Sequence, residues 1–293
     1  MSDTHPPPLA HLDGHAPERP AWFGAALALA PQRTWHEVQG ARVETLTWGE
    51  VGRPGLLLLH GKMAHADWWS FIAPFFAATH RVAALSFSGM GASDWREAYS
   101  VETLAAEAMA VARAEGLFEG QHKPVFVAHS FGAFAALLCA ERDGAAIGGV
   151  VTVDMPLLSR AQRERRRRPT LRGAFAGRPT RIYPSIARAL ARFRFAPPQP
   201  CENLFIADHL ARTSLKQVPL DDGSGTGWTW RFDPRVADIH PGDPARSLRA
   251  AACPVALAWG GESELVDADV VAHVTGLAPP GAPCIEIPPR ATT

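Results

Sequence analysis

The middle of the chain reads Lys123-Pro-Val-Phe-Val-Ala-His-Ser-Phe-Gly-Ala133, and Phe134-Ala-Ala-Leu-Leu-Cys-Ala140 follows at once. An apolar run rich in β-branched and aromatic residues ends abruptly at Ser130, which small residues flank. The next stretch is rich in alanine and places its apolar residues at helical spacing. This pattern predicts a strand, a sharp turn with Ser130 at its tip, and a helix.

The turn is similar to the G-x-S-x-G pattern, in which a sharp strand-to-helix turn exposes a serine nucleophile. Ala128-His-Ser-Phe-Gly132 departs from that pattern only at Ala128. The positions two before and two after the serine must be small because strand and helix approach closely there, and alanine meets that need. Taken alone, the pattern fits an ordinary turn with a surface serine equally well.

The composition is typical of a soluble globular protein. At 293 residues, 47% hydrophobic and 20% charged, the chain is long enough for one large α/β domain with an insertion. The zero formal net charge argues against nucleic acid or a membrane surface as a partner. The four scattered cysteines form no C-x-x-C pair, so we expect no metal, no cofactor and a cytoplasmic location. We expect a monomer or homodimer.

The order of patterns along the chain predicts alternating strands and helices. Residues 1–20 contain little that could pack, and we expect a disordered tail there. A short surface helix is expected at residues 21–30 and a hairpin through Gly40 at residues 35–48. Continuous apolar runs predict strands buried in a parallel sheet at 55–60, 81–87, 125–129 and 146–154, with helices at 67–78, 100–115 and after Ser130.

The periodicity changes between Met155 and about Pro244, where arginine, proline and aromatic residues are frequent. We interpret this stretch as an inserted cap. The expected domains are a discontinuous core of residues 21–154 and 248–293 and a cap of residues 155–247. The arginine-rich run at 163–168 is interpreted as a solvated helix face, because the chain carries no net charge. Beyond the cap, strands at 253–259 and 284–287 flank a helix at 267–277.

Polar side chains stand where successive strands end. His60, Ser86, Ser130 and Asp154 each follow an apolar run. In a parallel sheet with right-handed crossovers, ligands bind at the carboxyl ends of the strands. The coincidence predicts a functional site at that edge of the sheet.

Three motifs together resemble the α/β-hydrolase superfamily, from about Trp22 to the C-terminus. They are His60-Gly61 after the third strand, Ser88-Gly-Met-Gly-Ala-Ser-Asp94 after the fourth and Ala128-His-Ser-Phe-Gly132 after the fifth. Each motif alone is weak, while the combination is specific. The resemblance implies an α/β fold with a mostly parallel, doubly wound, eight-stranded sheet and a helical cap inserted after the sixth strand.

The resemblance also implies acyl transfer with Ser130 as the nucleophile. An oxyanion that forms on the substrate needs preorganised donors. The family's positions for these donors correspond to the backbone N–H of Phe131 and that of Lys62, or of Met63 if the loop is shifted by one residue. We expect the Lys62 side chain to face solvent.

The acid of the triad is left open between two positions. Asp154, after the sixth strand, is preferred. Glu264 is the alternative, in Gly260-Gly-Glu-Ser-Glu264 after the seventh strand, where Ser263 stands in place of the aspartate that the family usually has.

The catalytic histidine of this superfamily follows the eighth strand. Here that strand is followed by Pro288-Pro-Arg-Ala-Thr-Thr293, which contains no histidine. We therefore expect the base to lie beyond Thr293. The weaker substitutes are His60, His129, His209, His240 and His273.

The substrate is expected to be a small, largely apolar molecule, because apolar and aromatic residues are expected around the pocket. We assign substrate binding to His60, Trp68, Trp69 and Phe134, although core packing explains Trp69 and Phe134 equally well. Hydrolysis of an ester or related acyl bond is the first choice. The alternatives are hydrolysis of a C–C bond in a ring-fission product and a non-catalytic, hydrolase-fold binder of small molecules.

Overall fold

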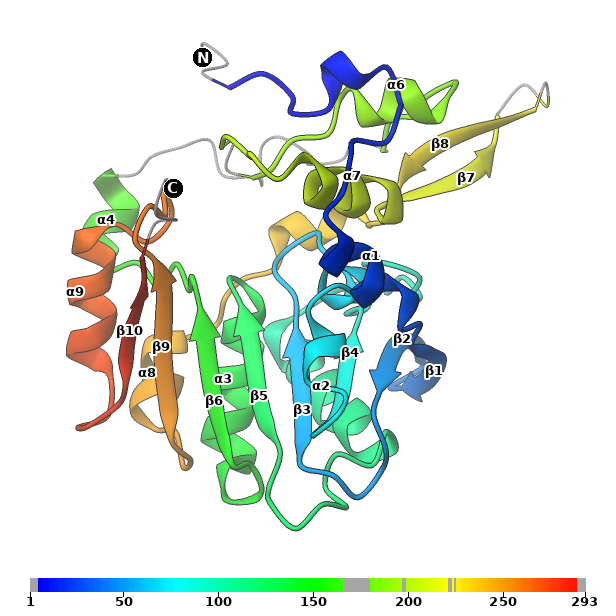
Figure 1. Ribbon diagram of the computed structural model, residues 1–293. Helices are drawn as coiled ribbons and strands as arrows, with labels where there is room; N and C mark the ends of the chain where they lie inside the picture. The colour runs from blue at the N-terminus through cyan, green and yellow to red at the C-terminus, as the bar shows by residue number, and fades with distance from the viewer. Residues whose placement is uncertain (1–4, 166–179, 197–198, 221–222, 224, 289–293) are drawn as a thin grey trace.

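The centre of the molecule is an eight-stranded sheet in the order β1-β2-β4-β3-β5-β6-β9-β10. It is seen in a computed structural model that describes residues 5–165, 180–196, 199–220, 223 and 225–288 (Figure 1). β2 is antiparallel to both of its neighbours, β1 and β4. The strands β4, β3, β5, β6, β9 and β10, in sheet order, are all parallel. The predicted mostly parallel sheet of eight strands is confirmed.

The inner strands β3, β4, β5, β6 and β9 coincide with the apolar runs of the sequence. The first two strands of the chain form the predicted hairpin, whose turn residues Gln39 and Gly40 both have positive φ. The strands are β1 (Gln32–Val38), β2 (Ala41–Trp48), β3 (Gly55–Leu59), β4 (Arg81–Leu85), β5 (Val125–His129), β6 (Gly149–Val153), β9 (Val255–Gly260) and β10 (Cys284–Ile287).

Helices on one face of the sheet enclose the main core. They are α2 (Val101–Ala114), α3 (Gly132–Asp143), α8 (Pro244–Arg249) and α9 (Ala268–Leu277). On the opposite face, β2, β3 and β4 are covered by the short 3₁₀ segments η2 (Ala66–Trp69) and η3 (Ala73–Phe75). The single helix expected at residues 67–78 is therefore wrong. Pro74 has no N–H for a helical hydrogen bond, and the carboxylate of Asp67 binds Arg33 instead of capping a helix.

Between β6 and β9 the chain leaves the sheet and lies above the carboxyl ends of the strands (Figure 1). We call the described residues of 155–243 the insertion. How the chain divides into domains stays a prediction. The arginine-rich run begins on an exposed helix end, and residues 166–168 lie outside the described residues. The insertion contains α4 (Arg160–Arg165), α6 (Ile186–Leu190), α7 (Leu204–Thr213), the hairpin β7 (Leu215–Pro219) and β8 (Thr226–Trp230), and η5 (Pro234–Asp238).

Residues 5–20, here called the strap, differ from the expected disordered tail. They include the 3₁₀ segment η1 (Ala10–Leu12) and run across the insertion into α1 (Ala21–Ala28), as Figure 1 shows. Leu9 is only 1% exposed. The expectation failed because the insertion provides an apolar surface on which the strap can bury Leu9, although the strap has few apolar residues of its own. Residues 1–4 lie outside the described part of the chain.

His60, at the end of β3, holds the loop after β3 against the loop after β4. Its ring is buried, Nε2 lies 3.0 Å from the backbone nitrogen of Phe87, and Nδ1 lies 2.7 Å from the carbonyl oxygen of Gly61. Because the Phe87 N–H can only donate, the neutral ring accepts at Nε2 and carries its proton on Nδ1. Burial lowers the pKa of His60 from 6.5 to about 3.

We expect this histidine to make the stability of the fold pH-dependent. The unfolded chain binds a proton near the ordinary histidine pKa of 6.5, while folded His60 stays neutral down to about pH 3. The unfolded state therefore binds more protons in this window, and the free energy of unfolding falls as the pH drops from 6.5 towards 3. Urea titrations at several pH values should show a smaller slope for His60→Gln. Some slope remains, because burial also lowers the pKa of His129 and His209.

The exposed His122 supplies the control, because His122→Gln should leave the slope as in the parent protein. A His60→Gln protein with the parent slope would contradict the assignment.

Candidate active site

Ser130 lies at the tip of the turn between β5 and α3, as the sequence predicts. Its φ is +51°, in the left-handed region that residues other than glycine rarely adopt. Its N–H donates to the carbonyl oxygen of Val153 at 2.8 Å, which ties the turn to the end of β6. A Cβ on Gly132 would lie 2.4 Å from the carbonyl oxygen of His60, so only glycine fits two residues after the serine. Ala128 is completely buried, which explains why a small residue also precedes the turn.

The loop after β3 is in direct contact with this turn. A Cβ added to Gly61 would lie 3.2 Å from Cβ of Ser130. Met63, two residues on, has φ +61°. Among the described residues, the N–H groups of Phe131 and Met63 have no hydrogen-bond acceptor. Phe131 precedes the first residue of α3, where N–H groups lack helical partners. The two loops therefore bring unpaired N–H donors to the neighbourhood of Ser130.

The Lys62 side chain extends to the insertion, and not into solvent as expected. Its Nζ lies 4.3 Å from the centroid of the Phe131 ring. The same amine donates to the carbonyl oxygens of Ala237 at 3.1 Å and Ile239 at 3.3 Å. Lys62 thus joins the loop after β3, the residue next to Ser130 and the end of η5. No local pattern in the sequence could indicate this contact, which spans 175 residues.

Of the two candidate acids, the structure places Asp154 beside the nucleophile strand and Glu264 in an exposed position. The backbone of Asp154 has φ +48°, and its N–H donates to the carbonyl oxygen of Ala258 at 2.9 Å. Its Oδ1 accepts from the Gly260 N–H at 3.0 Å, while Oδ2 has no hydrogen bond among the described residues. The hydrogen bond to Oδ1 thus holds the carboxylate in place, and Oδ2 remains able to accept a further hydrogen bond.

The structure does not bring a histidine into hydrogen-bond contact with Ser130. Within the described residues, the side chain of Ser130 makes no hydrogen bond. The His60 ring is already occupied at both nitrogens. His209, on α7, lies 2.8 Å from Oγ of Ser70, at the base of the insertion. His129 lies against Gly61, where burial lowers its pKa and the nearby Asp154 carboxylate offsets part of that shift. The two remaining candidates are elsewhere: His240 is exposed and His273 lies on α9.

The residues assigned to substrate binding occupy packed positions. His60 is buried, and Phe134 lies in the main core with its ring 5.4 Å from that of Phe131. Trp69 packs in the cluster on the opposite face of β2, β3 and β4. Trp68 packs on the cluster that joins the strap to the insertion. Packing accounts for these side chains, and their contact with a substrate stays a prediction.

A buried polar cluster next to the loop after β3 was not anticipated from the sequence. Asp67 binds Nη2 of Arg33 at 2.6 Å, and Arg33 also pairs with the fully buried Glu44. His65 lies between this pair and the insertion, with Nε2 2.9 Å from Oγ of Ser214. Burial alone would raise the pKa of Asp67, but His65 and Arg33 hold it below its usual range. The cluster joins the N-terminal hairpin, the loop after β3 and the insertion.

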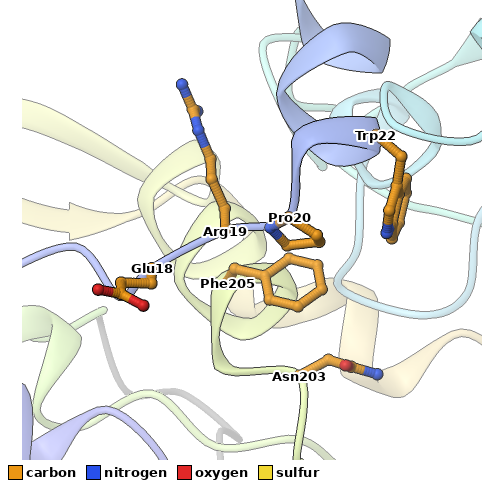
Figure 2. Close-up of a pocket in the computed structure, with 6 residues that line it drawn as sticks. All are labelled: Glu18, Arg19, Pro20, Trp22, Asn203 and Phe205. Atoms are coloured by element: carbon orange, nitrogen blue, oxygen red, sulfur yellow. The ribbon is translucent and has the colours of Figure 1, made fainter.

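A surface pocket of about 570 Å³ is lined by residues of the strap, of α1 and of the start of α7, and contains none of the predicted site residues. Figure 2 shows Phe205 of α7 beside Pro20 at the end of the strap, with Trp22 and Asn203 nearby. In the described ranges, no three His, Cys, Asp or Glu side chains are grouped so that they could bind a metal ion. Nor does any helix in those ranges have the length and apolar character needed to span a bilayer.

Comparison with solved structures shows which known proteins share this fold. The thioesterase domain from the curacin biosynthetic pathway has 24% identity and a TM-score of 0.69, over 89% of this chain and 93% of that chain. E-2-(acetamidomethylene)succinate hydrolase has 19% identity and a TM-score of 0.70, over 88% of this chain and 91% of that chain. An esterase from Mycobacterium tuberculosis has 20% identity and a TM-score of 0.63, over 92% and 89%. At these identities the likeness shows the fold alone.

Sequence comparison identifies the family. A search of curated protein sequences found no match. The family model described as the alpha/beta hydrolase family matches residues 56–290, which is well over half of the chain. The chain therefore belongs to the alpha/beta hydrolase family.

Proposed function

We propose that this chain hydrolyses an ester or related acyl bond of a small, largely apolar substrate, with Ser130 as the nucleophile. The observation that carries the proposal is the backbone at Ser130, which is held at φ +51° between β5 and α3, in contact with the loop after β3. Such a turn lifts the hydroxyl away from its own backbone, so that a base and a carbonyl carbon can approach it.

The chemistry of acyl transfer assigns roles to the groups around Ser130. Its Oγ attacks the substrate carbonyl carbon, and the carbonyl oxygen gains a negative charge. The N–H of Phe131 and that of Met63, or of Lys62, would donate to this oxyanion, and the N-terminus of α3 adds a partial positive charge. Loss of one such donor costs on the order of 3 kcal/mol of transition-state stabilisation.

Asp154 would orient the base. A serine triad needs an imidazole that takes the proton of Oγ, delivers it to the leaving group and is held by a carboxylate. Oδ2 of Asp154 has no hydrogen bond among the described residues, so it can accept from such an imidazole. Glu264 is exposed, and we assign it no part in the reaction.

The apolar substrate class rests on the side chains next to the nucleophile. Phe131 and Met63, which flank the proposed oxyanion position, are apolar, and the ammonium of Lys62 is engaged by backbone carbonyls. An uncharged acyl group therefore suits the site better than an anionic one. The cytoplasmic location and the monomeric or homodimeric state remain predictions.

A second candidate function is non-catalytic binding of small apolar molecules. One observation favours it: the side chain of Ser130 has no hydrogen-bond partner among the described residues, so no base is in place. A binder of this kind would keep its affinity when the hydroxyl is removed.

Covalent labelling of Ser130 separates the two functions. In the full-length protein, a fluorophosphonate probe should form an Oγ–P bond at Ser130 with loss of fluoride, and mass spectrometry of peptides should locate the label there. Ser130→Ala should abolish the label, while Ser263→Ala, at a partly buried serine after β9, should leave it unchanged. A folded full-length protein that takes up no label, and that binds an apolar dye equally well with and without the Ser130 hydroxyl, would establish the binder instead.

The rate of the same labelling reaction identifies the acid. Replacing the triad aspartate by asparagine lowers kcat of serine proteases by about 10⁴-fold, so we expect Asp154→Asn to slow labelling by at least about 100-fold. Glu264→Gln is the matched control and should stay within about twofold of the parent, since surface changes away from a site have small effects. The reverse order of effects would assign the acid to Glu264.

A further inference from the structure

The strap covers the outer side of the insertion. In Figure 1 it passes over α6, descends beside α7 and enters α1 next to the sheet. The insertion therefore lies between the strand ends on one side and the strap on the other. An insertion attached to the core only through its two chain ends could move away from the strand ends. Here the strap also contacts the insertion on the side that faces away from the sheet.

One apolar cluster unites the strap, the insertion and the core side. The 1%-exposed Leu9 packs in a cluster that also contains Leu190 of α6 and Leu210 of α7. Phe23 of α1 and Phe71, between η2 and η3, also belong to this cluster, and their rings lie 5.2 Å apart. Moving the insertion away would expose the whole cluster to water at once, which is unfavourable in proportion to its apolar area.

Two arginines of the insertion bind the backbone of the strap. Nη1 of Arg194 donates to the carbonyl oxygen of His5 at 2.6 Å, and Nη2 of Arg212 donates to that of Gly14 at 2.7 Å. Arg212 is itself fixed by Asp208, whose two oxygens lie 2.8 and 2.9 Å from Nε. Hydrogen bonds from charged donors are stronger than neutral ones, so both anchors add to the apolar contact.

Gly14 of the strap lies directly against α6 of the insertion. Its φ is +85°, and an added Cβ would lie 2.7 Å from Cβ of Ala187 on α6. A side chain at this position would both strain the backbone and push the strap away from α6.

The other end of the strap is anchored on the core. α1 packs on η3, and Nε1 of Trp48 in β2 donates to the carbonyl oxygen of Leu29, just after α1, at 2.9 Å. We propose that the strap is a latch: it keeps α6 and α7 closed over the strand ends, and its release is the step that allows the insertion to open.

Hydrogen–deuterium exchange of the full chain tests the latch without depending on any activity of Ser130. Gly14→Val should speed exchange of the α6 and α7 amides by at least about tenfold, because local opening then becomes easier, and should leave β3 and β5 as in the parent. The matched control is Gly52→Val, which imposes a similar strain at φ +90° in a position with no atom within 4 Å. It should leave exchange in α6 and α7 unchanged.

Leu9→Ala provides a milder second variant, which decides the matter if Gly14→Val does not fold. Faster exchange confined to the strap, with α6 and α7 unchanged, would overturn the proposal. Equally faster exchange in α6, α7, β3 and β5 would overturn it too, since the strap would then only support global stability.

Discussion

The packing of the loop after β3 against the turn after β5 is the constraint on which the site depends. No side chain fits on Gly132, because the carbonyl oxygen of His60 would lie 2.4 Å from its Cβ. A Cβ on Gly61 would lie 3.2 Å from Cβ of Ser130, which is also a tight contact. The backbone of the loop is therefore fixed relative to the serine, and the neutral His60 ring fixes it again from the β4 side. Donors held in this way need no rearrangement when charge develops on a substrate.

Much of the fold could be predicted because its determinants are local. Strands buried on both faces of a parallel sheet read as continuous apolar runs, and Gly55–Leu59 is one. Ser100 caps α2 through a hydrogen bond from the Thr103 N–H, a pattern visible within four residues. The position of Ser130 was also predictable, because the small residues Ala128 and Gly132 around it indicate that a strand and a helix approach closely there.

What could not be predicted depends on partners far away in the sequence. Asp67 binds Arg33 and so does not begin a helix, Leu9 is buried only because the insertion covers it, and Lys62 reaches carbonyls near residue 238. The same applies to the acid. Both Asp154 and Glu264 follow strands, so the sequence prefers one without excluding the other, and the structure separates them by the exposure of Glu264 and by the hydrogen bond from the Gly260 N–H to Asp154. Periodicity and turn chemistry contain no information about such pairs.

Three residues at the strand ends, Met63, Ser130 and Asp154, hold positive φ without being glycine. Such backbones cost of order 1–3 kcal/mol each, less for Asp154 because aspartate tolerates this region better, in a domain stable by roughly 5–15 kcal/mol. Glycine at any of these positions would relieve the strain. A lineage that no longer used the site would therefore gain stability by drifting towards glycine there. Three strained side chains at one edge of the sheet therefore cost stability where the strands end, and strain of this kind clusters at active sites and ligand clamps.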